Sequence, residues 1–143
     1  MATLFGVGRA PVAPGTAASA LTGVVLWAVP TSTGGLGLTL LVVLLAGTWA
    51  ADRAERVIGS KDPGVIVIDE VAGMILSVLL LPRTATVLVT GFLLFRVFDV
   101  LKPFPAGVSQ RLRGGVGVML DDMIAGLYAL VILLVLRAGI GRP

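Results

Sequence analysis

The chain contains neither cysteine nor histidine in its 143 residues. The absence of cysteine excludes disulfides and thiolate nucleophiles, and the absence of both residues excludes structural zinc sites of the usual kind. Without histidine there is also no imidazole acid–base chemistry. Any catalysis must therefore use carboxylates, lysine, arginine, hydroxyl groups, backbone dipoles or a hard metal ion.

Charged residues are also scarce, at 13% of the chain, whereas apolar residues make up 57%. A soluble domain normally has about 25% charged residues, and the mean hydropathy here is +1.04. So few charged and polar side chains cannot cover the surface of a globule that faces water on every side. We therefore expect an all-α fold, with residues 1–143 forming one domain: a polytopic membrane helical bundle of about five short apolar helices, some of them short enough to be re-entrant.

Nucleic-acid binding is not expected, because the net charge is only +3 and no basic run is interleaved with aromatic residues. From residue 10 to residue 51 there is no charge, and Pro30 with the small residues 31–35 divides this stretch. The pattern predicts helices at about 16–29, capped by Thr16, and at about 36–52. The charged segment that follows is expected to be aqueous or interfacial, and a last apolar helix is expected at 123–136.

The segment 69–101 allows two interpretations, a single long helix or two antiparallel helices joined at Pro82 and Arg83. A single span would place Arg83 near mid-bilayer, at a cost of about 2.5–3.5 kcal/mol, and would include a helix-breaking proline. The hairpin is therefore favoured. Its first helix, 69–82, would reach only about 21 Å across a hydrocarbon core of about 30 Å.

Five spans would place all eight acidic residues on one side of the membrane, together with eight of the eleven basic residues. Only Arg83, Arg137 and Arg142 would remain on the opposite side. The positive-inside rule makes the crowded side cytoplasmic. The acidic residues then become candidates for a cluster at one membrane surface.

Two acidic doublets, Asp69-Glu70 and Asp121-Asp122, stand at the expected starts of two apolar helices. Helix capping would explain one member of each doublet. Asp99 lies near a helix C-terminus, where the dipole disfavours an anion, so it either pairs with a basic residue three positions away or shares a metal with the doublets. Ionisable residues at membrane depth are functional by default.

Carboxylates gathered without histidine or cysteine favour a hard cation such as Mg²⁺, which also binds substrate phosphates. Lys61, Arg96, Lys102 and Arg113 are the nearby cations that would contact phosphate oxygens. Small residues follow the acids at four-residue spacing, as in Asp69, Gly73 and Ser77, and again in Asp122 and Gly126. This spacing lets membrane helices pack closely and would bring the two doublets together.

Four blocks complete the pattern: FGVGRAPVAPGT (5–16), KDPGVIVIDEVAG (61–73), FRVFDVLKPFP (95–105) and GGVGVMLDDMIAG (114–126). With these blocks in this order, the chain closely resembles the phosphatidylglycerophosphatase A family of bacterial membrane phosphatases. The resemblance implies a Mg²⁺-dependent enzyme of the bacterial inner membrane, with its site facing the cytoplasm. Its substrate would be the phospholipid phosphatidylglycerophosphate, hydrolysed to phosphatidylglycerol and phosphate.

Carried onto this sequence, the family's motif positions give the following expected roles. The expected metal ligands are Asp69, Asp99 and Asp122. The expected catalytic residues, which position or deprotonate water, are Glu70, Asp121 and Asp62. The expected phosphate-binding residues are Lys61, Arg96 and Lys102 at motif positions, together with Arg113, which is expected only as a basic residue near the acids. Direct attack by water and an aspartyl-phosphate intermediate both remain open. Two other functions also remain open: a small membrane ion transporter or channel, and a membrane phosphatidyl-group transferase.

Overall fold

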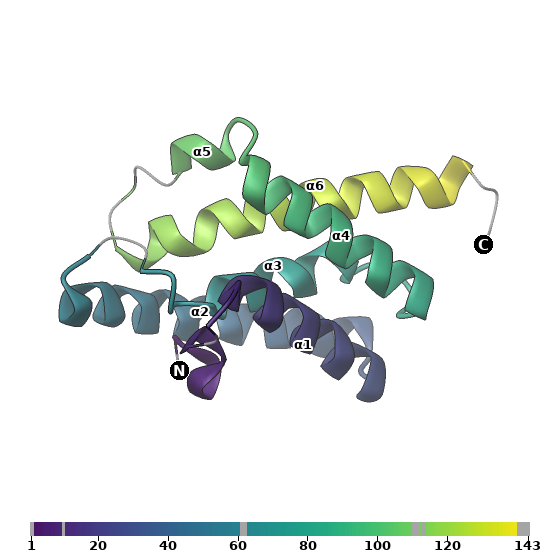
Figure 1. The fold of residues 1–143 in the computed structure, drawn as a ribbon. Coiled ribbons are helices and arrows are strands. Elements are labelled where there is room, and N and C mark those ends of the chain that lie inside the picture. The colour runs from purple at the N-terminus through teal and green to yellow at the C-terminus, as the bar shows by residue number, and fades with distance from the viewer. Residues whose placement is uncertain (1, 10, 61–62, 110–111, 113, 140–143) are drawn as a thin grey trace.

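The computed structural model describes the chain except for residues 1, 10, 61–62, 110–111, 113 and 140–143. The described residues form helices and no strand (Figure 1). Their order is η1 (Leu4–Arg9), α1 (Pro14–Ala28), α2 (Thr33–Ile58), α3 (Ile68–Val78), α4 (Ala85–Leu101), α5 (Ala106–Ser109) and α6 (Gly115–Gly139). The expected all-α class is confirmed.

The short helix α3 lies at the centre and packs against α1, α2, α4 and α6. Its apolar side chains are buried all round, including Ala72, Met74 and Val78, each at 0% exposure. A helix that buries nearly all of its apolar side chains needs neighbours on most of its sides. The eleven residues of α3 span only about 16 Å, and the four helices around them enclose the core.

Within the described residues, two helices are long and apolar enough to cross a membrane, α2 and α6. On α2, a stripe of large apolar side chains faces outward: Leu38, Leu41, Leu45 and Trp49 are 52–67% exposed. An apolar stripe of this size on a surface indicates contact with lipid or another apolar partner. The other described helices do not meet the criteria for a span, so the five-span bundle stays a prediction.

The favoured hairpin is confirmed, because α3 and α4 are separate helices. Thr84 caps α4, its hydroxyl oxygen accepting the N–H of Val87 at 3.3 Å. The guanidinium of Arg83 donates to the backbone oxygen of Thr31, which ties the hairpin turn to the turn between α1 and α2. The first helix of the hairpin ends at Val78 and is shorter than predicted.

Several predicted helix boundaries were wrong. Helix α1 starts at Pro14, and the residue before it, Ala13, has a left-handed backbone; Thr16 is therefore inside the helix and not its cap. Helix α2 is capped by Ser32, which accepts the N–H of Gly35, and it continues to Ile58 through the segment expected to be aqueous or interfacial. Its last residues include alanine, arginine and glutamate, which are good helix formers whatever their hydropathy.

Helix α6 also begins earlier than expected, at Gly115 instead of Met123. Asp121 and Asp122 therefore lie in its second turn, and N-terminal capping does not explain this doublet. The glycine start has a packing reason: a Cβ on Gly115 would lie 1.9 Å from the backbone oxygen of Thr48 on α2. Only glycine allows the two backbones to approach this closely.

Candidate active site

Three carboxylates from two helices converge in the interior. Asp69 and Glu70 lie in the first turn of α3, and Asp122 lies in the second turn of α6. One oxygen from each side chain lies within 4.8 Å of the others. Asp69 is 6% and Asp122 2% exposed, so solvent screens these charges poorly.

The convergence follows from a close crossing of α3 and α6 one turn further along. A Cβ on Gly126 would lie 2.5 Å from the backbone oxygen of Gly73, and a Cβ on Gly73 would lie 2.3 Å from the Phe95 ring. Any side chain at either glycine would push the helices apart. The small residues predicted to let the doublets meet therefore do so, and they hold Asp69 and Asp122 at one level.

The three carboxylates fit a divalent cation by their own chemistry. Two unit charges 4.8 Å apart repel by about 3.5 kcal/mol at an effective dielectric of about 20. In addition, Glu70 Oε2 and Asp122 Oδ2 are buried with no hydrogen-bond partner among the described residues. Such oxygens are costly unless something satisfies them. A hard cation with oxygen ligands, such as Mg²⁺ or Ca²⁺, would satisfy them and offset the repulsion.

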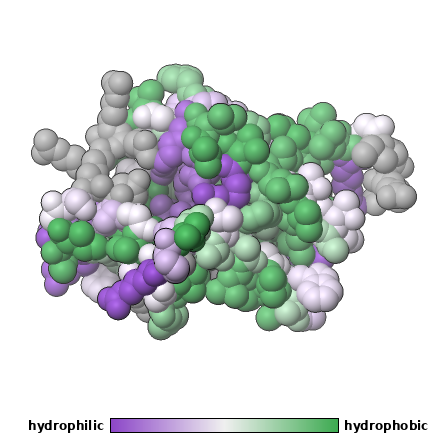
Figure 2. Space-filling model, in the orientation of Figure 1, coloured by the Kyte–Doolittle hydropathy of each residue, from purple (hydrophilic) through white to green (hydrophobic). Residues whose placement is uncertain are grey.

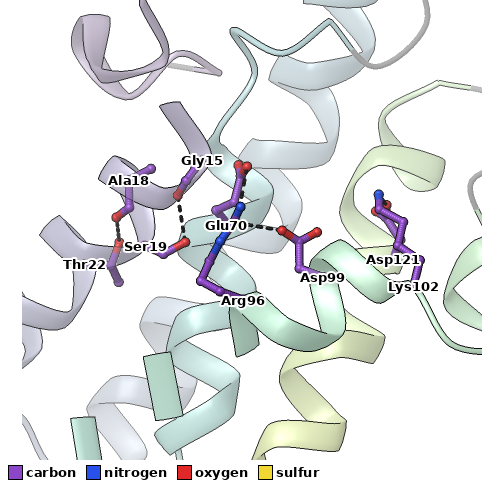
Figure 3. A network of polar contacts seen from close by, with 9 residues as sticks. All are labelled: Gly15, Ala18, Ser19, Thr22, Glu70, Arg96, Asp99, Lys102 and Asp121. Atoms are coloured by element: carbon purple, nitrogen blue, oxygen red, sulfur yellow. Dashed lines mark hydrogen bonds and ion pairs between the residues drawn. The ribbon is translucent and has the colours of Figure 1, made fainter. Parts of the chain in front are cut away.

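Arg96 on α4 stands beside Glu70, one member of the triad (Figure 3). Its Nη1 lies 2.6 Å from Asp99 Oδ2 and 4.0 Å from Glu70 Oε1. One of the two open explanations for Asp99, an ion pair with a neighbouring base, is therefore present. Asp99 also lies close enough to Glu70 for its charge to act on that carboxylate, so it adjoins the triad without being one of its three members.

Helix α1 contributes backbone instead of charge to the site. A Cβ on Gly15 would lie 1.9 Å from Glu70 Oε1 and 3.3 Å from Arg96 Nη1. The Ser19 hydroxyl donates to the Gly15 carbonyl oxygen at 2.8 Å (Figure 3). The sequence reading did not assign Gly15 to the site, although the residue belongs to the first of the four blocks. The available signal was a glycine directly after proline, next to the expected helix start at Thr16.

A second ion pair joins Lys102 to Asp121, with Nζ 2.5 Å from Oδ2. Lys102 ends α4 in a left-handed backbone conformation, with φ of 45°. Burial lowers the pKa of Lys102, but the hydrogen bond and charge of Asp121, together with the charges of Asp99 and Asp122, outweigh that effect and leave the pKa above its usual value. Lys102 is therefore a stable cation next to the acidic group.

The surroundings of Glu70 change its proton affinity. Burial raises the pKa of Glu70, and the charge of Asp99 adds to this effect. The hydrogen bond from Asp69 and the charge of Arg96 act in the opposite direction but do not cancel it. A proton and a metal ion therefore compete for this carboxylate at a higher pH than is usual for glutamate.

The site can be reached from one face of the molecule. Figure 2 shows a hydrophilic patch at the centre of that face, between the C-terminal half of α4 and the start of α1, with hydrophobic side chains around it. The cations are more open than the acids: the side chains of Lys102 and Arg96 are 29% and 19% exposed, and that of Asp121 is 4% exposed. An anion approaching this face would meet the cations first.

The structure thus brings together most of the residues singled out from the sequence. They are Asp69, Glu70, Arg96, Asp99, Lys102, Asp121 and Asp122. Three other expected site residues, Lys61, Asp62 and Arg113, lie outside the described residues. The grouping differs from the expected metal set in one member, since Glu70, and not Asp99, completes the carboxylate triad.

Comparison with known proteins places the chain in a family. The model of the family described as Phosphatidylglycerophosphatase A matches residues 1–137. A protein of Bacteroides thetaiotaomicron named "Putative phosphatidylinositol-3-phosphatase" is 38% identical, over 97% of this chain and 92% of its own length. Proteins named "Phosphatidylglycerophosphatase A" are 32% identical in Haemophilus influenzae, over 96% of this chain and 86% of that protein, and 34% identical in Escherichia coli, over 93% and 79%. No solved structure matches the chain significantly.

Proposed function

The chain belongs to the phosphatidylglycerophosphatase A family, and on that premise we propose that it hydrolyses the terminal phosphate of phosphatidylglycerophosphate. The products are phosphatidylglycerol and inorganic phosphate. The observation that carries the proposal is the buried triad of Asp69, Glu70 and Asp122, with two cations beside it. Such a pairing suits a metal-dependent phosphomonoesterase, which holds a metal ion and a phosphate dianion together.

Asp69, Glu70 and Asp122 are the residues that would hold Mg²⁺. Each offers an oxygen within 4.8 Å of the others, and oxygen ligands are those that Mg²⁺ prefers. When bound, Mg²⁺ supplies Lewis-acid polarisation of a phosphate oxygen and offsets its negative charge. Asp99 supports the site from outside this set, by holding Arg96 at 2.6 Å.

Arg96 and Lys102 bind the phosphate oxygens and stabilise the charge that builds up on them. Each can do so without giving up its acidic partner, since a guanidinium has five N–H donors and an ammonium has three. Lys102 keeps Asp121 at 2.5 Å, next to the phosphate. Asp121 is thus the carboxylate assigned to take the proton from the attacking water.

In the reaction, the water oxygen forms a bond to phosphorus while the bond from phosphorus to the glycerol oxygen breaks. Asp121 accepts the proton that the water loses and later releases it to solvent, and the departing glycerol oxygen takes up a proton from solvent water. No covalent enzyme intermediate is required, so direct attack by water is preferred to an aspartyl-phosphate route. The stereochemistry at phosphorus, followed with an isotopically chiral phosphate ester, distinguishes the two routes, because one displacement by water inverts the configuration whereas two successive displacements retain it.

The lipid headgroup of the substrate needs a direct test, because one relative is named as a phosphatidylinositol-3-phosphatase. The test is phosphate release by the purified full-length protein from phosphatidylglycerophosphate and from phosphatidylinositol 3-phosphate, each with Mg²⁺ and with a chelator. Mg²⁺-dependent release, faster from phosphatidylglycerophosphate, supports the proposal. Faster release from the phosphoinositide would make phosphatidylinositol 3-phosphate the substrate instead. Release from neither lipid would refute the phosphatase function.

The same preparation separates the two rival functions. Ion flux into liposomes without phosphate release would indicate a transporter or channel, and transfer of a phosphatidyl group with release of a nucleotide would indicate a transferase. The position of the acids argues against a channel, since the two doublets, Asp69-Glu70 and Asp121-Asp122, lie in the first turn of α3 and the second turn of α6 and not along a path.

The proposed location is the bacterial cytoplasmic membrane, with the site facing the cytoplasm. The natural sequence has no cysteine, so Ser60→Cys, after α2, and Leu80→Cys, in the hairpin turn, each introduce a single thiol. A membrane-impermeant maleimide should label Leu80→Cys from the outside and Ser60→Cys only after the membrane is opened. Labelling of both from the same side would refute a hairpin that spans the membrane.

A further inference from the structure

An apolar groove runs between α1 and α4. Its volume is about 370 Å³, and its walls include Ala20, Gly23 and Trp27 of α1 and Ala85, Leu88 and Phe92 of α4. Every residue along it is apolar or glycine. The groove is thus suited to a hydrocarbon, and the indole N–H of Trp27 is the one side-chain hydrogen-bond donor among its lining residues.

The groove leads away from the candidate site. Helices α1 and α4 are antiparallel neighbours (Figure 1), with Gly15 beside Arg96 at one end of the pair and Trp27 with Ala85 at the other. Phe92 is one helical turn from Arg96. On α1, the residues that line the groove begin at Ala20, five residues after Gly15, and end at Trp27, which is about 11 Å along the helix at about 1.5 Å per residue. Gly15 adjoins Glu70, and the Trp27 end of the groove opens among exposed apolar side chains.

Gly23 makes the groove possible. A Cβ at this position would lie 3.5 Å from Met74 Cε, an ordinary contact. A methyl group would therefore be tolerated there, whereas a longer side chain would occupy the groove itself. Because Gly23 has no side chain, space remains between α1 and α4 over the buried surface of α3. Met74 is part of that surface.

We propose that this groove holds an acyl chain of the phospholipid substrate while the headgroup phosphate lies at Arg96 and Lys102. The inference rests on the proposed function and adds a specificity element to it. Its basis is continuity: the same two helices that hold Arg96 and support Glu70 form the walls of the groove. A lipid has this arrangement of parts, with a charged phosphate joined to hydrocarbon. The groove supplies binding in the ground and transition states alike, so its loss raises KM and leaves kcat unchanged.

The test compares substrates that differ only in their tails. Phosphatidylglycerophosphate with two acyl chains of about 16 carbons and its analogue with chains of about 6 carbons, which bury less hydrocarbon, are assayed with the wild type and Gly23→Leu. Gly37→Leu is the matched control, because a Cβ on this α2 glycine would meet nothing within 4 Å. Ala20→Leu fills the same groove from a second position and serves if Gly23→Leu folds poorly.

For the long-chain substrate, Gly23→Leu and Ala20→Leu should raise KM about tenfold or more with kcat within about twofold of the wild type. For the short-chain substrate, kcat/KM should stay within about twofold, and Gly37→Leu should match the wild type on both. Equal effects on the two substrates, or no effect on either, would overturn the role of the groove while leaving the phosphatase function in place.

Two other occupants predict different results. If a second copy of the chain filled the groove, Gly23→Leu would change the oligomeric state in detergent and the discrimination between chain lengths would remain. If bulk membrane lipid filled it, neither KM would change. Absence of phosphate release from both substrates by the wild type would refute the proposed function itself, which distinguishes that failure from failure of the groove.

Discussion

Replacement of Asp122 by asparagine tests the metal assignment most directly. The substitution keeps the shape of the side chain and removes one charge from a triad whose oxygens lie within 4.8 Å of one another. Without metal, Asp122 faces two like charges, each repelling it by about 3.5 kcal/mol at an effective dielectric of about 20. A buried carboxyl can take up a proton instead, so this repulsion is an upper limit. The metal-free Asp122→Asn protein should therefore be at least as stable as the wild type.

Addition of Mg²⁺ should reverse that order. At a concentration of about 100 times Kd, a ligand that binds only the folded state stabilises it by about 2.7 kcal/mol. For a chain of about 150 residues this raises Tm by about 5–11 °C. Asp122→Asn should show little of this shift, and its Mg²⁺-dependent turnover should fall by at least about 100-fold. Thermal denaturation in detergent, with and without Mg²⁺, and phosphate release measure the two effects on one preparation.

Asp52→Asn is the matched control. Asp52 also makes an ion pair, with Arg56 at 2.8 Å, but its side chain is 35% exposed and lies on α2. An exposed pair of this kind contributes only about 0–1 kcal/mol, so the control should keep both the Mg²⁺ shift and the activity. The reasoning fails if Asp122→Asn behaves like Asp52→Asn, or if it unfolds more readily than the wild type without metal.

Other consequences of the structure can be measured separately. Gly126→Ala should lower stability by about 1–3 kcal/mol in chemical denaturation, because its Cβ would lie 2.5 Å from the Gly73 oxygen; an unchanged midpoint would contradict the close crossing. Lys102→Gln should cost about 3–5 kcal/mol by leaving Asp121 buried without its cation and should also raise KM for the phosphate substrate, so a wild-type denaturation curve would contradict it. Since burial raises the pKa of Glu70, protons should displace Mg²⁺ from it as the pH falls; Mg²⁺ titrations between about pH 8 and pH 5 should give a rising apparent Kd, and a flat profile would exclude Glu70 as a ligand.

The sequence alone was sufficient for features that depend on composition or on short spacing. The scarcity of charge predicted a helical, apolar protein, and Pro82 with Arg83 predicted the hairpin turn between α3 and α4. The four-residue spacing from Asp69 to Gly73 and from Asp122 to Gly126 predicted the close crossing of the two helices. These patterns are local, because each depends on the helix repeat or on a residue that breaks a helix.

Helix ends were less predictable, for two physical reasons. Hydropathy marks where a segment leaves an apolar environment, but α2 continues to Ile58 because its charged last turns still favour a helix. Glycines at 114–117 indicate a loop by propensity, yet Gly115 begins α6 because the Thr48 backbone on α2 lies where a Cβ would be. Packing of this kind joins residues that are distant in the sequence.

The sequence by itself determined which kinds of groups the site contains: carboxylates with lysine and arginine, and neither histidine nor cysteine. Only the tertiary structure decided which carboxylates form the triad and which ones pair with a basic residue. Glu70 joins Asp69 and Asp122, whereas Asp99 holds Arg96 and Asp121 holds Lys102. The reason is geometric, since neighbouring residues on a helix point about 100° apart and their partners depend on how α1, α4 and α6 are placed around α3.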